Sequence, residues 1–377
     1  MMPLAAQRIA RRLAVAWTLC LAPVACTRAP PAATAVDAEA HPDAATDAAA
    51  LSSVWAVGRT SADWTDPSRE TPANAEVAAH PGRHLPVQVW YPAAGTPGAD
   101  PVDHADPAQG SFPLVLFVHG SSGTPGVYTG ICARIAALGY VVAAADFPLT
   151  SLTTDGGPSD WHAEDEQRDL AFRADQLLGA SVPAPLAGHL DPAAGYAVVG
   201  HSTGGTVALL AAYRPDFHDD RVRAAVDLSG DSCFFEAPFF ATRAVPLLAV
   251  GATRDLLVPA ANNPARAFQL ASPPAVLAIL RGGTHLKMTD FSIDDPTDSP
   301  PTGLDDPLAQ TMAAWGKADA CRPIPPPGTE PLLGHDEQRD LTAQLARAFL
   351  DAHLKGSPAG LQALLATPDP RVALQAK

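Results

Sequence analysis

Residues 200–205 read Gly-His-Ser-Thr-Gly-Gly, and they stand between an apolar run at 196–199 and a helical pattern at 203–213. A G-x-S-x-G pattern between a strand and a helix predicts a turn too tight for flanking side chains. The serine then occupies a strained apex, and the helix N-terminus behind it favours developing negative charge. The stretch predicts a nucleophile, Ser202, in an elbow formed by Gly200, His201 and Gly204. An ordinary Gly-rich turn is the alternative interpretation.

Apolar runs alternate with helical patterns along the chain outward from this hexapeptide. Strands are predicted at 85–91, 112–118, 140–145, 196–199, 222–228, 245–250 and 275–280, and helices at 127–138, 165–178, 203–213 and 335–354. This alternation predicts the α/β class, with a mostly parallel central sheet and helices on both faces. Ligands in such sheets bind beyond the carboxyl ends of the strands, so reactive residues should follow the apolar runs directly.

A base and an acid for the serine are predicted at two such positions. A serine is a weak nucleophile unless a histidine, oriented by a carboxylate, removes its proton. Asp255 follows the run at 245–250 and His285 follows the run at 275–280. The order Ser, Asp, His along the chain is the one that α/β-hydrolases use. The sequence therefore predicts a catalytic triad of Ser202, Asp255 and His285.

Each partner has an alternative. Asp255 could instead cap the next helix or pair with Arg254, and Asp227 and Asp231, near the end of the preceding strand, are rival acids. His285 could be an ordinary histidine of a surface loop. The triad hypothesis requires the carboxylate and the imidazole to meet at one edge of the sheet.

The oxyanion hole needs two backbone donors directed at the carbonyl oxygen of the substrate. One predicted donor is the N–H of Thr203, directly after the nucleophile. The second predicted donor is the N–H of Ser121, in the loop His-Gly-Ser-Ser-Gly at 119–123 that follows the strand at 112–118.

Four further stretches accompany the hexapeptide: LPVQVWYP at 85–92, FVHG at 117–120, GYVVA at 139–143 and GGTH at 282–285. Together they resemble the platelet-activating-factor acetylhydrolase and dienelactone-hydrolase-like branch of the α/β-hydrolases, which is similar to bacterial polyester hydrolases. The resemblance covers about 57–354. It implies the α/β-hydrolase fold and ester hydrolysis, often of short acyl groups, without a metal or cofactor.

A Pro- and Asp-rich insert at 286–334 departs from that family pattern, because it separates the histidine from the last helix. Its length suggests a lid as one hypothesis. Trp161, Phe234 and Phe235 are predicted to line the substrate pocket, with plain packing as the alternative interpretation.

The composition of the chain limits the kinds of molecule that the protein is expected to bind. The net charge is −15, which argues against nucleic acid and anionic membrane surfaces. The sequence has no zinc-binding or nucleotide-binding motif, so we expect no metal and no cofactor. The expected partner is a small-molecule or lipid-like ester.

The N-terminus predicts export. Three arginines precede an apolar run at 13–25, which is too short to span a bilayer. Residues 21–26, LAPVAC, resemble a bacterial lipobox in which Pro23 replaces the usual Leu. We predict a signal peptide at 1–26 with lipidation of Cys26; plain signal-peptidase cleavage is the alternative. The protein would then be a periplasmic or cell-surface lipoprotein, or secreted, and would touch a membrane only through that lipid.

The remaining chain is predicted to contain a disordered tether at 27–50, a hydrolase domain at 51–360 that includes the insert, and a C-terminal tail at 361–377. In an oxidising compartment Cys233 and Cys321, both in loop-like surroundings, are the predicted disulfide. Cys132 lies in an apolar helical pattern and is predicted to be a buried, small apolar residue.

The predicted function is a serine ester hydrolase, either a carboxylesterase or an acetylhydrolase-like enzyme. Two alternatives remain open on the sequence. One is a peptidase or amidase with the same triad, and the other is an inactive surface binding protein of the same fold.

Overall fold

Strands from both ends of the chain join one sheet in the computed structural model, which describes residues 55–159, 165–291 and 328–377. All described residues belong to one compact unit. Several predicted features lie outside them: the signal peptide at 1–26 with Cys26, the tether at 27–50, Trp161, Cys321 and the middle of the insert.

The sheet contains ten strands within the described residues, in the spatial order β10-β9-β8-β7-β6-β4-β5-β2-β1-β3. The strands from β9 to β5 in this order are mutually parallel, whereas β2 pairs antiparallel with β5 and β10 pairs antiparallel with β9. Their bounds are β1 (Ala56–Thr71), β2 (His80–Ala93), β3 (Pro101–Asp103), β4 (Leu114–Val118), β5 (Val141–Ala145), β6 (Tyr196–His201), β7 (Val222–Leu228), β8 (Leu247–Ala252), β9 (Ala275–Leu280) and β10 (Val372–Ala376).

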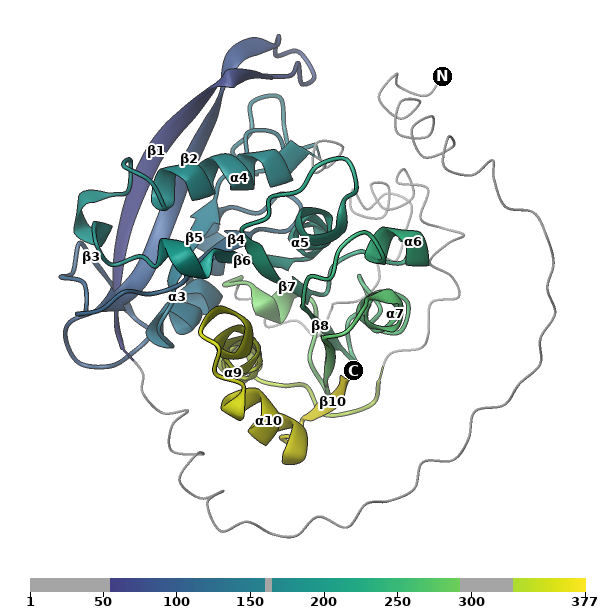
Figure 1. The fold of residues 1–377 in the computed structure, drawn as a ribbon. Helices are drawn as coiled ribbons and strands as arrows, with labels where there is room; N and C mark the ends of the chain where they lie inside the picture. Colours follow the sequence, from purple (N-terminus) through teal and green to yellow (C-terminus); the bar gives the residue numbers. More distant parts are fainter. Residues whose placement is uncertain (1–54, 160–164, 292–327) are drawn as a thin grey trace, which may run out of the picture. The chain divides into compact units, whose positions relative to one another are not determined.

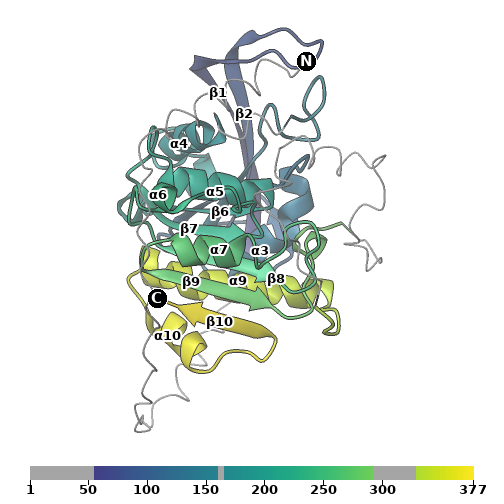
Figure 2. The same cartoon turned by 90° about the vertical axis from the view of Figure 1, so that its right-hand side faces the viewer.

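Helices cover both faces of this sheet (Figures 1 and 2), which confirms the predicted architecture. On one face α4 (Glu166–Leu177), α5 (Thr203–Tyr213), α6 (Ala237–Phe240) and α7 (Pro264–Leu270) contribute buried side chains to one core. On the other face α3 (Thr129–Ala137) and α9 (His335–Leu354) contribute to a second core, with α10 (Ala359–Ala366) packed beside α9. Short 3₁₀ turns lie at Pro125–Tyr128, Ala184–Leu186, Pro192–Ala194 and Leu286–Met288.

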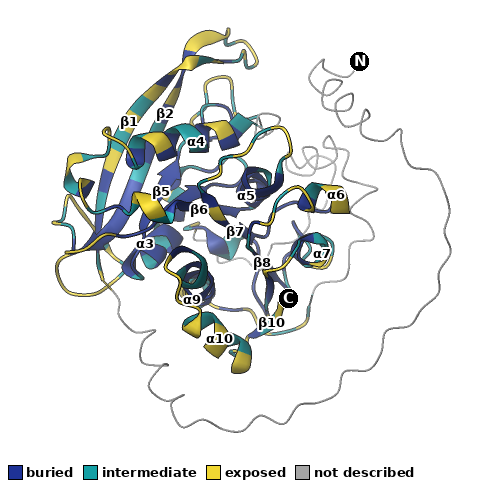
Figure 3. Ribbon diagram, viewed as in Figure 1, coloured by how far each residue is buried: buried dark blue, intermediate teal, exposed yellow. Residues whose placement is uncertain are grey.

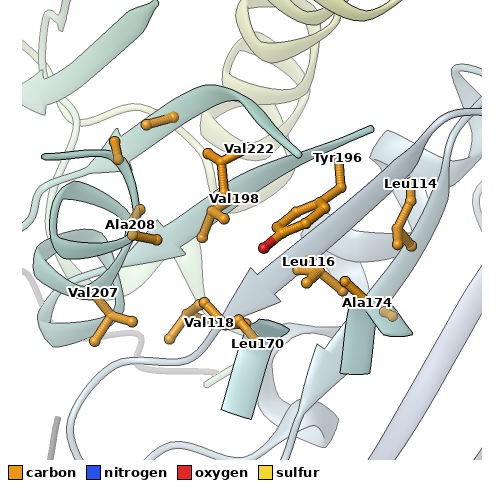
Figure 4. Close-up of a cluster of buried hydrophobic side chains, with 14 of the residues drawn as sticks. Leu114, Leu116, Val118, Leu170, Ala174, Tyr196, Val198, Val207, Ala208 and Val222 are labelled. Atoms are coloured by element: carbon orange, nitrogen blue, oxygen red, sulfur yellow. The ribbon is translucent and has the colours of Figure 1, made fainter. Parts of the chain in front are cut away.

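Strand β4 shows why the central strands read as continuous apolar runs. Leu114, Leu116 and Val118 point into the first core, where Figure 4 shows them near α4 and α5, and Val115 and Phe117 point into the second core. Successive side chains alternate between faces, and both faces are covered, so every position must be apolar. The central strands are accordingly dark blue in Figure 3.

The C-terminal residues differ from the prediction. Residues 361–377 were expected to form a tail outside the domain, but they contain most of α10 and all of β10. β10 pairs with β9 from Val372 to Ala376, and Lys377 and Ala275 exchange both backbone hydrogen bonds. Pairing satisfies the N–H and C=O groups along the edge of β9, which would otherwise be exposed. The described domain therefore extends through Lys377.

Both described ends of the insert belong to the domain body. The Asp290 N–H donates to the Val127 carbonyl oxygen, and the Leu333 N–H donates to the Gly282 carbonyl oxygen. Met288 and Leu333 are buried in the second core. The prediction of a separate insert at 286–334 therefore applies only to its middle, residues 292–327, which lies outside the described residues.

Two cysteines, Cys132 and Cys233, lie within the described residues. Cys132 is buried and free, as predicted. Cys233 is disulfide-bonded, and its predicted partner Cys321 lies outside the described residues. Among the helices that the structure describes, none combines the length and apolar character needed to cross a bilayer.

Candidate active site

The predicted reactive residues lie at one edge of the sheet. Ser121 follows β4, Ser202 follows β6, Asp255 follows β8 and His285 follows β9. These four strands are parallel, so their carboxyl ends lie on the same side. Residues separated by more than a hundred positions in sequence are thereby gathered at the edge where α/β sheets bind ligands.

Ser202 occupies a strained turn between β6 and α5. Its φ is 57° and its ψ is −126°, a conformation that costs a non-glycine residue about 1–3 kcal/mol. The Ser202 N–H donates to the Leu228 carbonyl oxygen at 2.9 Å, which ties the apex to β7. A Cβ atom at Gly200 would overlap the Gly204 carbonyl oxygen, and one at Gly204 would overlap the Val118 carbonyl oxygen. The turn therefore needs both glycines and leaves the partly exposed serine at its tip.

His285 and Asp255 form a buried pair. His285 Nδ1 lies 2.8 Å from Asp255 Oδ2, and both side chains are almost completely buried. The other carboxylate oxygen, Oδ1, accepts N–H groups from Leu257 at 3.1 Å and Val258 at 2.7 Å. Both carboxylate oxygens of Asp255 thus have hydrogen-bond partners. An ionised Asp255 holds the His285 proton on Nδ1 and leaves Nε2 as the basic nitrogen.

The structure supports neither alternative for Asp255. Its Oδ1 accepts N–H groups of the loop residues Leu257 and Val258, whereas the next helix, α7, begins only at Pro264, and Oδ2 contacts the histidine. Arg254 donates instead to the Glu330 carbonyl oxygen at 3.0 Å. His285 is buried, in contrast to an ordinary surface-loop histidine.

The base lies next to the nucleophile's turn. The rings of His285 and His201 are 4.5 Å apart between centroids, and His201 directly precedes Ser202. The loop that carries the base is held from the second core by Gln338 of α9. Gln338 accepts the Thr284 N–H at 2.9 Å and donates to the Thr284 carbonyl oxygen at 2.7 Å. This buried amide fixes the backbone beside the imidazole.

The loop after β4 approaches the nucleophile closely. A Cβ atom at Gly120 would lie 2.9 Å from the Ser202 Cβ atom. The N–H groups of Gly120 and Ser122 donate to the Tyr128 hydroxyl and the Thr150 carbonyl oxygen. Ser121, the predicted oxyanion donor, lies between these two anchored residues. The second predicted donor, the Thr203 N–H, is in the first turn of α5, where a helix has no internal acceptor.

The rival acids lie near α5 and not beside the base. Asp227, at the end of β7, is fully buried, and its Oδ1 accepts the Gly230 N–H at 2.6 Å. Within the described residues its Oδ2 has no hydrogen-bond partner. Burial raises the pKa of Asp227 to about 7. The Asp231 carbonyl oxygen accepts the Thr206 hydroxyl. Among the side-chain hydrogen bonds that the structure describes for the three candidate acids, the one to His285 comes from Asp255.

The predicted aromatic pocket is partly core packing. Phe235 stacks on Phe239 at 3.9 Å between centroids, and Phe239 and Phe240 both contact the Tyr213 ring. Phe235 packs against the first core, whereas Phe234 is 40% exposed. Contact of Phe234 with substrate remains a prediction.

Sequence reasoning missed two residues of this edge. Gln338 holds the base loop, and Tyr128 connects the Gly120 N–H to His201 Nδ1. Both come from helical segments with no recognisable motif, and each acts on residues distant in sequence.

Within the described ranges, no group of three or more His, Cys, Asp or Glu side chains is placed to hold a metal ion.

Comparison with known proteins provides an independent view of the fold. The sequence matches the Alpha/beta hydrolase family over residues 115–368, a range that includes Ser202, Asp255 and His285. The structure is similar to that of a ferulic acid esterase from Streptomyces cinnamoneus, with a TM-score of 0.59 and 23% identity, covering 85% of this chain and 96% of that chain. At this identity the similarity shows a shared fold. No curated protein matches the chain.

Proposed function

Because the chain belongs to the alpha/beta hydrolase family, we propose that it is a serine ester hydrolase with Ser202 as its nucleophile. The observation that carries the proposal is the buried His285–Asp255 pair beside a strained serine turn. The base, its orienting acid and the nucleophile's turn occur together at one sheet edge, as acyl transfer requires.

In the proposed acylation step, Ser202 Oγ attacks the ester carbonyl carbon while His285 Nε2 takes the hydroxyl proton. The imidazolium that forms is stabilised by Asp255, whose Oδ2 lies 2.8 Å from Nδ1. The carbonyl oxygen becomes an oxyanion and accepts the N–H groups of Thr203 and Ser121. When the tetrahedral intermediate collapses, the alcohol departs with the proton from His285.

Deacylation repeats these steps with water as the nucleophile. His285 removes a proton from water, the hydroxide adds to the acyl carbon, and collapse of the intermediate returns the proton to Ser202 Oγ. The carboxylic acid is released and the serine is restored. Every proton passes through one nitrogen of His285, so the reaction needs no group beyond these residues and water.

The choice of an ester substrate rests on two supports. The sequence resembles the platelet-activating-factor acetylhydrolase and dienelactone-hydrolase-like branch, whose members hydrolyse esters. The solved structure with the similar fold is named a ferulic acid esterase. We propose esters with short acyl groups as the first substrates to examine.

The decisive experiment replaces the nucleophile. Ser202→Ala should lower kcat for a short nitrophenyl ester by about 10⁴-fold or more, because base and acid cannot act without it. Ser232→Ala is a matched control: Ser232 is a fully buried serine near the same edge, and its hydroxyl has no partner among the described residues. A fluorophosphonate should label wild type and the control, but not Ser202→Ala.

The outcomes separate the alternatives. Undiminished turnover in Ser202→Ala would refute the proposed function. Faster cleavage of peptides or amides than of esters by wild type would identify a peptidase or amidase. Absence of both turnover and labelling in folded wild-type protein would identify an inactive binding protein.

We also propose that the protein is exported and lipidated on Cys26, as its N-terminal sequence suggests. Expression in a bacterium fed radiolabelled palmitate should label wild type and not Cys26→Ala. Equal labelling of the two proteins would contradict lipidation at this cysteine.

A further inference from the structure

One phenol hydroxyl joins two parts of the candidate site. Tyr128 is buried at the end of the turn Pro125–Tyr128. Its Oη accepts the Gly120 N–H at 2.9 Å and lies 2.9 Å from His201 Nδ1. Gly120 belongs to the loop predicted to bind the oxyanion, and His201 precedes the nucleophile. The hydroxyl therefore bridges the oxyanion loop and the nucleophile's turn.

The direction of each hydrogen bond follows from the donors available. A backbone N–H can only donate, so Gly120 uses the oxygen of Tyr128 as its acceptor. Within the described residues, His201 Nδ1 is the remaining partner of the hydroxyl. A buried hydroxyl that donated to nothing would lose a hydrogen bond, so Tyr128 gives its proton to Nδ1. His201 is then neutral, with its own proton on Nε2, a buried nitrogen that has no hydrogen-bond partner among the described residues. The opposite tautomer would leave both Nε2 and the phenol proton without a partner.

His201 separates this bridge from the base. It is 1% exposed, and its ring lies 4.5 Å from the His285 ring at an interplanar angle of 43°. The titratable groups that contact it among the described residues are Tyr128 on one side and His285 on the other, and Asp255 contacts His285 from the loop after β8. Burial and the neighbouring His285 hold the pKa of His201 well below its usual range. A neutral ring beside His285 does not oppose the imidazolium formed during acylation.

We propose that Tyr128 and His201 are positioning residues of the reaction: Tyr128 holds His201 in its Nε2-protonated form, and the His201 ring holds the His285 imidazole in place. The inference rests on the proposed function, because it assigns these residues to the base of that reaction. Neither residue touches the reacting atoms. Their effect should therefore appear in kcat and not in substrate affinity.

The first test removes the hydroxyl. Tyr128→Phe should lower kcat for a short nitrophenyl ester by about 10- to 100-fold with KM changed less than about twofold. Tyr213→Phe is the matched control, because it also deletes one buried hydroxyl, which donates to the Val245 carbonyl oxygen at 2.6 Å. Tyr213 lies in the first core at the far end of α5, so this variant should keep wild-type kcat. Equal kcat for the two folded variants would overturn the proposal.

The second test asks whether Tyr128 acts through His201. His201→Phe keeps an aromatic ring against His285 but cannot accept the hydroxyl proton. If the two residues act as one unit, kcat of the double variant should be no lower than about half the kcat of the slower single variant. Independent, multiplicative losses in kcat would overturn the proposal.

The third test needs no catalysis and covers the case in which a variant misfolds. Nitrogen-15 shifts of the histidine rings in wild type should show Nδ1 of His201 unprotonated and Nε2 protonated, with the ring resonances assigned through their bonded correlations to the His201 backbone. A proton on Nδ1 would overturn the assignment.

Failure of this inference is distinguishable from failure of the proposed function. Ser202→Ala decides whether the serine reaction occurs. If that variant is inactive while Tyr128→Phe retains wild-type kcat, the reaction stands and only the positioning role is lost.

Discussion

The end of β7 and the loop after β8 each bury one carboxylate, and the two carboxylates have different hydrogen-bond partners. Asp255 is 3% exposed and Asp227 is 0% exposed. Asp255 receives two N–H groups on one oxygen and the His285 imidazole on the other. Asp227 receives one N–H on Oδ1, and Oδ2 has no partner within the described residues. Two carboxylates that are equally buried thus differ in the number and direction of their hydrogen-bond donors.

The largest expected difference between the two carboxylates appears when each is replaced by a neutral amide. Asp255→Asn should lower kcat by about 10³- to 10⁴-fold, because an amide no longer holds the His285 proton on Nδ1. Asp227→Asn should change kcat only a few-fold, since Asp227 has no contact with the base. Steady-state kinetics on a short nitrophenyl ester measures both. A larger loss in Asp227→Asn would make that residue the acid.

The free energy of unfolding should depend on pH through Asp227. The pKa of Asp227 rises from 3.8 unfolded to about 7 folded, so between these values the folded state holds more protons than the unfolded state. Stability from this group is full below about pH 4 and is lost as pH rises through 7. The loss should be on the order of 4 kcal/mol, given about 1.4 kcal/mol for each pKa unit.

Asp227→Asn should remove that part of the pH dependence, because a neutral amide does not titrate. Urea unfolding of both proteins at pH 5 and pH 8 measures the difference between their free energies of unfolding. Parallel pH profiles for wild type and variant would contradict a titrating Asp227.

A smaller effect should come from the turn that holds Asp227. A Cβ atom at Gly230 would overlap Asp227 Oδ1 and lie 2.7 Å from the Thr206 nitrogen of α5. Gly230→Ala should therefore lower the free energy of unfolding by about 1–3 kcal/mol. Gly98→Ala is the control, because its Cβ would meet nothing within 4 Å. Equal urea midpoints for the two variants would show that the turn after β7 can relax.

The smallest effect concerns the neighbour of Asp227. The negative charge of Asp231 contributes to the raised pKa of Asp227. Asp231→Asn should move the midpoint of the stability–pH profile downward by less than about one unit, because desolvation is the larger cause. An upward shift in the same urea series would contradict this direction.

Much of the fold was predictable because buried parallel strands must be apolar at every position. The predicted strands at 222–228 and 275–280 and the helix at 335–354 coincide with β7, β9 and α9. The strands that were not predicted are β1, β3 and β10, and the helices that were not predicted are α6, α7 and α10. β1 alternates with many exposed polar residues, and β10 is short with an exposed end. Such strands depend on the partner they pair with, which local sequence does not identify.

The sequence by itself determined which residues follow the strands: Ser202, Asp255 and His285 each stand directly after an apolar run, in the order of an α/β-hydrolase triad. The contact of His285 with Asp255, and the support that Gln338 and Tyr128 give to the base loop and the nucleophile's turn, became visible in the folded structure. The physical reason is that strand position depends on local apolar pattern, whereas hydrogen-bond partners depend on how β6, β8, β9, α3 and α9 pack together. Residues remote in sequence meet only when that packing is complete.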